Sequence, residues 1–128
     1  RIDRIELDDE GVRVVDYKTT RHSPATQQEA RESLQLGFYA LAVGADEDLR
    51  QLGEPIAAEF WYPLHESKRS LTTRSLDLAN LPEIGQRLIQ LGADIASEKW
   101  EPVAGDWCDR CDFATSCPIQ AQGGDQFI

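Results

Sequence analysis

Residues 1–8 and 12–19 are two β-rich runs, and their connection limits the fold more than any other feature of the sequence. The connection, Asp8-Asp9-Glu10-Gly11, ends in glycine, which adopts positive φ without steric cost and so predicts a β-hairpin. If the loop spans residues 8–11, or only its central pair, Asp3 lies directly opposite Asp16 on one face of the hairpin. A three-residue loop would shift the register by one residue and send Asp3 to the other face.

Two carboxylates that face each other across a hairpin repel, and a divalent cation between them would remove the repulsion. Mg²⁺ and Mn²⁺ prefer carboxylate, carbonyl and water oxygens. Lys18 shares the face of Asp16, since residues two apart in a strand point the same way, and its ammonium could orient a water or offset charge on a phosphate. The alternative is a set of solvated ion pairs worth little. The valines around Asp16 favour a partly buried strand, where an unpaired carboxylate is costly.

The rest of the chain alternates helical and strand-like segments. Thr26 is a predicted N-cap with Glu29 as its capping-box partner, and the helix is expected to run to about Val43 and to close at Gly44. The later elements follow in order: a connection over residues 45–55, a hairpin from residues 56–64 and 68–76, and a helix from about Pro82 to about Trp100. The order β-β-α-β-β-α with an irregular tail predicts a mixed α/β layered domain.

Gln35 and Tyr39 lie four residues apart and so share one face of the first predicted helix. This helix follows soon after the strand that carries Asp16 and Lys18, and it could bring both polar side chains to the same place. They would then suit contact with phosphate or with metal-bound water. The alternative, which the sequence leaves equally open, is a core tyrosine with its hydroxyl at the surface and a solvated glutamine.

Three cysteines, Cys108, Cys111 and Cys117, lie within ten residues of one another. An odd number in a tight cluster is a poor disulfide framework and indicates metal or iron–sulfur ligation. The spacing Cys-x2-Cys-x5-Cys-Pro favours iron–sulfur over zinc, which takes four ligands. His22 and His65 are far away in sequence, so one ligand is missing in either case.

Composition narrows the class of protein. The 128 residues suffice for about one domain with its own core. A net charge of −10 argues, taken alone, against a nucleic-acid partner, because polyanion binders need Lys and Arg; bound metal ions or another domain would weaken that argument. The sequence shows no signal peptide and no membrane-spanning run, so a cytoplasmic protein without membrane contact is expected. The chain begins at Arg1 and lacks methionine, which we interpret as part of a longer protein.

Together the motifs resemble the RecB-like branch of the PD-(D/E)XK nuclease superfamily. The likeness is to members with iron–sulfur cysteines, found in AddAB-type and AdnAB-type helicase–nucleases and in CRISPR-associated RecB-like nucleases. It rests on Ile2-Asp3-Arg4-Ile5, Val14-Val15-Asp16-Tyr17-Lys18-Thr19, Gln35-Leu36 with Tyr39-Ala40, and Cys108-x2-Cys111-x5-Cys117-Pro118. It implies a restriction-endonuclease-like mixed β-sheet flanked by helices over residues 1–104 and a cysteine-bearing tail over residues 105–128.

The resemblance also implies a function. Such proteins are DNA exonucleases or endonucleases that use Mg²⁺ or Mn²⁺ in DNA repair and recombination, beside a helicase domain or subunit. By this likeness Asp3, Asp16 and the Tyr17 carbonyl would bind the metal, and Lys18 would position or activate water. Gln35 and Tyr39 would support the site and the DNA backbone. The cysteines would hold a [4Fe–4S] cluster that staples the tail to the start of the domain.

The sequence also departs from this family. An upstream helix with a His or acidic site residue, and an upstream first cysteine, have no counterpart in these residues, so we expect weak or no cleavage and an incomplete cluster from them alone. Two other classes of function stay open: an inactive nuclease-like domain that scaffolds a complex or guides single-stranded DNA, and an interaction module with a metal-bearing tail and no nucleic-acid role. The intact pair Asp16 and Lys18 favours the enzyme, since an inactive site has no need of both.

Overall fold

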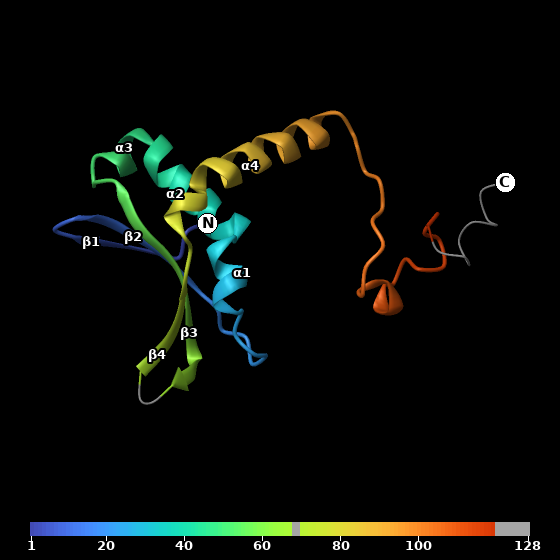
Figure 1. Ribbon diagram of the computed structural model, residues 1–128, viewed down its shortest axis with the longest axis horizontal. Coiled ribbons are helices and arrows are strands. Elements are labelled where there is room, and N and C mark those ends of the chain that lie inside the picture. Colours follow the sequence, from blue (N-terminus) through green and yellow to red (C-terminus); the bar gives the residue numbers. More distant parts are fainter. Residues whose placement is uncertain (68–69, 120–128) are drawn as a thin grey trace. The chain divides into compact units, whose positions relative to one another are not determined.

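A single mixed sheet organises the protein. In the computed structural model, which describes residues 1–67 and 70–119, the strand order is β1-β2-β3-β4 (Figure 1). The strands are β1 (Arg4–Asp8), β2 (Gly11–Tyr17), β3 (Pro55–Ser67) and β4 (Ser70–Ser75). β1 pairs antiparallel with β2, β2 parallel with β3, and β3 antiparallel with β4. A parallel pair requires a long crossover, which here is helical, and the result is the mixed α/β architecture that the element order predicts.

The helices lie in the crossover and after β4. They are α1 (Gln27–Arg31), α2 (Leu34–Ala45), α3 (Glu47–Arg50), α4 (Leu81–Ala96) and the 3₁₀ turns η1 (Leu78–Asn80) and η2 (Cys108–Arg110). The N-cap Thr26 and its capping box with Glu29 are confirmed. The expectation of one unbroken helix to Val43 is wrong, because the Ser33 side chain accepts a hydrogen bond from the Leu36 N–H and starts a second helix.

Three further boundaries differ from the sequence prediction. Gly44 does not close α2, which continues to Ala45. Residues 45–55 are not a plain connection, since Asp46 caps the short helix α3 with its carboxylate. The last helix ends at Ala96 rather than near Trp100. The second hairpin is confirmed, although residues 68–69 of its second predicted strand lie outside the described residues.

Strand β2 is central, and its valines build the core. Val12 and Val14 are fully buried against α2, whose inward residues include Leu36, Ala40 and Val43. Each buried valine or leucine contributes about 1.5–3 kcal/mol when its side chain leaves water. The helices of the crossover cover this face of the sheet, as Figure 1 shows. The candidate site residue Asp16 is therefore carried by a strand whose valines are packed into the core.

Two glycines close the end of the sheet where β1 turns into β2. Gly11 has φ 151° and Gly53 has φ 125°, a region that favours glycine. A Cβ on Gly11 would lie 2.4 Å from the Glu54 carbonyl oxygen, whereas in the structure the neighbouring Val12 N–H donates to that oxygen at 2.9 Å. This close approach fixes the register between β2 and the start of β3.

The other face of the sheet carries charged side chains that are paired with one another. Arg13 Nη1 lies 2.8 Å from Glu59 Oε1, and Trp61 Nε1 donates to Glu59 Oε2 at 2.7 Å. Arg4 forms an ion pair with Glu6 at 2.6 Å. Val15 on this face is fully buried, because the stems of long charged side chains can cover apolar surface.

The chain divides into two compact units, residues 1–91 and 92–128, with the boundary inside α4. The first holds the sheet, and the second holds the end of α4 and the cysteine-bearing segment. The predicted division into residues 1–104 and 105–128 stays a prediction. None of the described helices is long and apolar enough to cross a membrane.

Candidate active site

Asp16 is a buried carboxylate near the end of β2. Only 5% of the residue is exposed, and β2 pairs it laterally with Phe60 of β3. A carboxylate in such surroundings is costly unless it has partners. Oδ1 accepts a hydrogen bond from Gln35 Nε2 at 3.1 Å, and Oδ2 lies 2.8 Å from Lys18 Nζ. Asp16 is thus the polar residue on the face of β2 that also carries the buried Val12 and Val14.

The two oxygens of Asp16 are not equivalent. Oδ2 is fully buried, and no hydrogen bond from the described residues is directed at it, although the Lys18 ammonium is close enough for an ion pair. Distance alone sets the ion pair, whereas a hydrogen bond also requires that the donor point at the acceptor. Oδ2 therefore has charge compensation without a directed donor, and it has capacity left for a cation.

Lys18 is held from several sides. Its backbone N–H donates to the Trp61 carbonyl at 2.8 Å, which extends the β2–β3 pairing past Tyr17. Its Nζ donates to Gln35 Oε1 at 2.8 Å and lies 4.6 Å from the centre of the Phe60 ring. A cation over an aromatic face is stabilised by about 0.5–2 kcal/mol. These contacts fix the ammonium beside Asp16.

Gln35 links the strand to the helix. It lies in the first turn of α2, and besides its bond to Asp16 its Nε2 donates to the Tyr39 hydroxyl at 3.2 Å. Tyr39 is 9% exposed and belongs to the core, so it is a core aromatic whose hydroxyl also serves the polar cluster. The structure brings Asp16, Lys18, Gln35 and Tyr39 together, and we refer to these four residues as the tetrad.

Asp3 is exposed and lies just before β1. The hairpin register that pairs Arg4 with Val15 and Leu7 with Val12 is the one predicted from the turn. Asp3 Oδ2 accepts a hydrogen bond from the Tyr17 N–H at 3.0 Å, which fixes its carboxylate next to the backbone that follows Asp16. Asp3 and the Tyr17 backbone are therefore neighbours of the tetrad.

Phe60 belongs to the hairpin predicted over residues 56–64 and was not predicted as a site residue, yet its ring contacts the Lys18 ammonium. Its position follows from the parallel pairing with Asp16, a long-range contact without a local sequence signal.

Two side chains, Arg4 and Glu29, have pKa values that are shifted from their usual ones. A hydrogen bond to the Tyr17 hydroxyl, with Glu6 nearby, raises the pKa of Arg4. Hydrogen bonds from Thr26 lower the pKa of Glu29.

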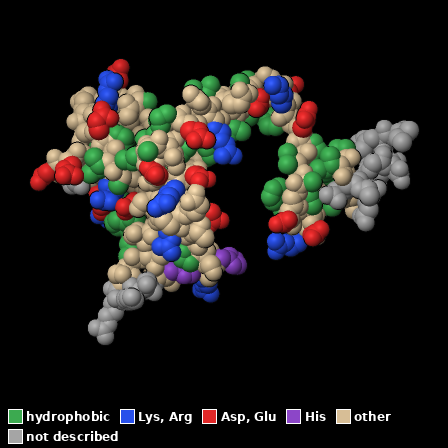
Figure 2. Space-filling model, in the orientation of Figure 1, with side chains coloured by type: hydrophobic (Ala, Val, Ile, Leu, Met, Phe, Trp, Pro, Cys, Tyr) green, Lys and Arg blue, Asp and Glu red, His purple; other side chains and the backbone are tan. Residues whose placement is uncertain are grey.

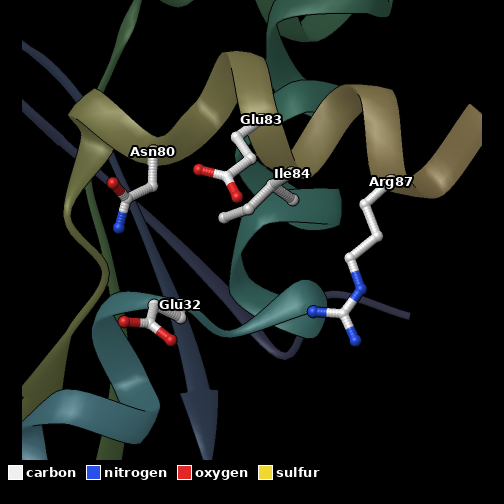
Figure 3. Close-up of a pocket in the computed structure, with 5 residues that line it drawn as sticks. All are labelled: Glu32, Asn80, Glu83, Ile84 and Arg87. Carbon is white, nitrogen blue, oxygen red and sulfur yellow. The ribbon is translucent and has the colours of Figure 1, made fainter.

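A separate pocket is lined by residues at the end of α1, in η1 and in α4. Its volume is about 240 Å³, and the residues that line it are Glu32, Asn80, Glu83, Ile84 and Arg87. Figure 3 shows Glu83, Ile84 and Arg87 on α4, facing Glu32 at the end of α1 and Asn80 in η1. No tetrad residue lines this pocket, and we locate the chemistry at the tetrad because a buried, partnered carboxylate is found there.

The cysteines do not form a ligand cluster in the described part of the chain, where no three Cys, His, Asp or Glu side chains converge on one point. Cys108 begins η2, the Cys111 N–H donates to the Cys108 carbonyl at 3.2 Å, and all three thiols are free and half-buried. The Gly105 N–H donates to Cys108 Sγ at 3.4 Å. The described conformation thus does not itself fit an iron–sulfur cluster.

Comparison with known families identifies the superfamily of the chain. The model of the PD-(D/E)XK nuclease superfamily matches residues 1–118. The chain belongs to the PD-(D/E)XK nuclease superfamily. Its sheet and helices are consistent with the restriction-endonuclease-like fold of that superfamily, which confirms the predicted fold class. No curated protein gives a significant match to the chain.

PD-(D/E)XK proteins are usually nucleases that act on DNA and typically use divalent metal ions, so we tested whether this chain could hold one. The hard oxygen donors in and beside the tetrad are the carboxylate of Asp16 and that of Asp3, which accepts from the Tyr17 N–H. Mg²⁺ and Mn²⁺ prefer such donors. Asp16 Oδ2, buried and without a directed hydrogen bond, is the atom that a cation would engage. The chemistry of these donors fits a divalent metal ion, but no three Asp, Glu, His or Cys side chains of the described residues converge on one point there.

Proposed function

We propose that the chain is the metal-dependent DNA-cleaving domain of a RecB-like helicase–nuclease that acts in DNA repair or recombination. The observation that carries the proposal is the buried Asp16 carboxylate, which is held by Lys18 and Gln35 and keeps one oxygen without a directed donor. A purely structural carboxylate at 5% exposure would be expected to have both oxygens satisfied. The superfamily membership supports hydrolysis of nucleic acid.

In this proposal each residue has a distinct task. Asp3, Asp16 and the Tyr17 carbonyl would hold the metal ion, which when bound lowers the pKa of a water and stabilises charge on the phosphoryl group. Lys18 offers its ammonium to the attacking water or to a phosphate oxygen. Gln35 fixes both the carboxylate of Asp16 and the ammonium of Lys18 by hydrogen bonds.

Tyr39 and Phe60 position these groups. The Tyr39 hydroxyl accepts from Gln35, which orients the amide so that its oxygen faces Lys18. Phe60 closes one side of the ammonium, so that water reaches Lys18 from fewer directions. Because strand β2 and helix α2 are part of the core, the cluster is held ready with little reorganisation.

The experiment is a strand-cleavage assay on the full-length protein with Mg²⁺ or Mn²⁺. We expect Asp16→Ala to lower the cleavage rate by about 10²-fold or more, a magnitude typical of removing one charge-stabilising group. Asp9→Ala, at an exposed position in the β1–β2 turn, is the matched control and should cleave as the wild type does. Equal rates for Asp16→Ala and the wild type would refute the catalytic assignment and leave an inactive scaffold that guides single-stranded DNA.

We also propose, on sequence spacing alone, that Cys108, Cys111 and Cys117 bind a [4Fe–4S] cluster together with a ligand outside these residues. The cysteines would have to move together from their described positions to do so. Anaerobically purified full-length protein is expected to be brown and to contain iron. A colourless protein that carries zinc would contradict this assignment.

A further inference from the structure

We propose that the loop between β2 and α1 binds the phosphate backbone of the nucleic-acid strand and leads it to the tetrad. We call residues 18–26 the basic loop. The inference rests on the proposed nuclease function and adds to it the surface on which the substrate lies.

The basic loop interrupts the acidic charge of the chain. The whole sequence holds 23 Asp and Glu against 13 Lys and Arg, yet residues 17–28 contain no acid and include Lys18, Arg21 and His22. Strand β4, which packs nearby, also lacks acids and carries Arg74. Favourable contact with phosphates requires such a local concentration of positive charge, whatever the net charge of the chain.

Strands β3 and β4 hold the basic loop in place. His65 Nε2 lies 2.9 Å from the Thr20 carbonyl oxygen. The Tyr62 hydroxyl accepts from the Ala25 N–H at 3.1 Å, and Arg74 Nε donates to the Ala25 carbonyl at 3.0 Å. Both ends of the loop are therefore tied to the sheet, so binding there would order few additional groups.

Lys18 of the basic loop is paired with Asp16, whereas the other basic side chains of the loop are available. Arg21 and His22 are exposed, and among the described residues neither they nor Arg74 form an ion pair with a carboxylate. The first acid after the basic loop, Glu29, accepts hydrogen bonds from Thr26 in the capping box. The arginines on the open face of the sheet are different, since Arg4 and Arg13 are paired with glutamates there. The free positive charge thus lies at the loop rather than on that face.

The location of this charge suits the site. Figure 2 shows the histidines, with Lys and Arg side chains beside them, at the end of the sheet domain away from most of its visible Asp and Glu side chains. Lys18 both begins the basic loop and belongs to the tetrad, so the charged surface is continuous with the proposed reacting centre. Three residues of extended chain span at most about 10 Å, so Arg21 lies within reach of a phosphate close to the cleaved one.

The test measures binding separately from cleavage. The probe is a fluorescein-labelled single-stranded DNA of about 20 nucleotides, bound to the full-length protein in EDTA and followed by fluorescence anisotropy at several salt concentrations. Each phosphate contact on a single strand contributes a slope of about 0.7 in log K against log[salt], so at 0.1 M salt its loss weakens binding about fivefold. We expect Arg21→Ala to raise Kd about fivefold and to reduce the slope by about 0.7.

Arg50→Ala is the matched control, because Arg50 is also exposed and lies in α3, outside the basic loop. It should change Kd by less than about twofold, and both variants should melt at the wild-type temperature. If Arg21→Ala binds with wild-type affinity and salt slope, or if Arg50→Ala weakens binding equally, the inference is overturned. Cleavage by wild type but not by Asp16→Ala would leave the nuclease proposal standing in that case, so the two failures are distinguishable.

Discussion

The hydrogen bonds of the tetrad predict that Tyr39 affects the cleavage rate only through Gln35. Tyr39 reaches Asp16 and Lys18 only through Gln35, whose Nε2 is shared between Asp16 Oδ1 at 3.1 Å and the Tyr39 hydroxyl at 3.2 Å. Gln35→Ala removes two hydrogen bonds to charged groups, each worth about 1.5–3 kcal/mol in a buried setting. Because Gln35 is itself exposed and water can replace it in part, we expect a total loss of about 1.5–3 kcal/mol, which is a 10- to 150-fold lower cleavage rate.

Tyr39→Phe removes one neutral hydrogen bond, worth about 0.5–1.5 kcal/mol, and should lower the rate about 2- to 10-fold. In the Gln35→Ala background it should have no further effect, because the contact through which it acts is already gone. The assay is single-turnover cleavage of a labelled DNA strand with Mn²⁺, and thermal melting serves as the control for folding. If Tyr39→Phe lowers the rate by the same factor in both backgrounds, the proposed route through Gln35 is wrong.

Three other perturbations test the fold and the site. Hydrogen bonds lower the pKa of Glu29 from its usual 4.5, so its pKa in the folded state lies below that in the unfolded state. The stabilisation by its carboxylate is therefore present above about pH 4.5 and is lost as the pH falls. Glu29→Gln should accordingly make the free energy of unfolding, measured in urea, depend less on pH in the acid range. Gly37→Ala would place a Cβ 2.5 Å from an isoleucine methyl of α4. The cost of overpacking exceeds the gain in helix propensity, so Gly37→Ala should lower the free energy of unfolding by about 1–2 kcal/mol. A Cβ on Gly44 would have no atom within 4 Å, so Gly44→Ala should raise the free energy of unfolding measured in urea. Phe60→Leu removes the ring 4.6 Å from the Lys18 ammonium and should slow cleavage about 2- to 10-fold, with recovery in Phe60→Tyr.

The hairpin was predictable because its information is local. The glycine at the end of the loop indicates the turn, and a loop of two or four residues gives the observed pairing of Leu7 with Val12, whereas a three-residue loop would have shifted it. The Gln35–Tyr39 contact was half predictable, since helical spacing shows that the two share a face but not whether that face meets the sheet.

The other features of the candidate site depend on contacts between residues that are distant in sequence. Phe60 reaches Lys18 through a parallel pairing that no turn specifies, because 37 residues separate Tyr17 from Pro55. The break between α1 and α2 was missed because serine within a helical pattern is only weakly unfavourable, whereas Ser33 as an N-cap is favourable. The cysteine spacing indicates ligands but not the group that would gather them.

The most direct test of the central claim is Mn²⁺ binding to the full-length protein by calorimetry. The account predicts that Asp16→Asn weakens binding about tenfold or more, since it removes the charge of the buried oxygen. It predicts that Lys18→Met binds Mn²⁺ at least as tightly as wild type, since the competing ammonium 2.8 Å from that oxygen is gone. Binding by Asp16→Asn that equals the wild type would contradict the assignment of Asp16 as the cation-binding centre.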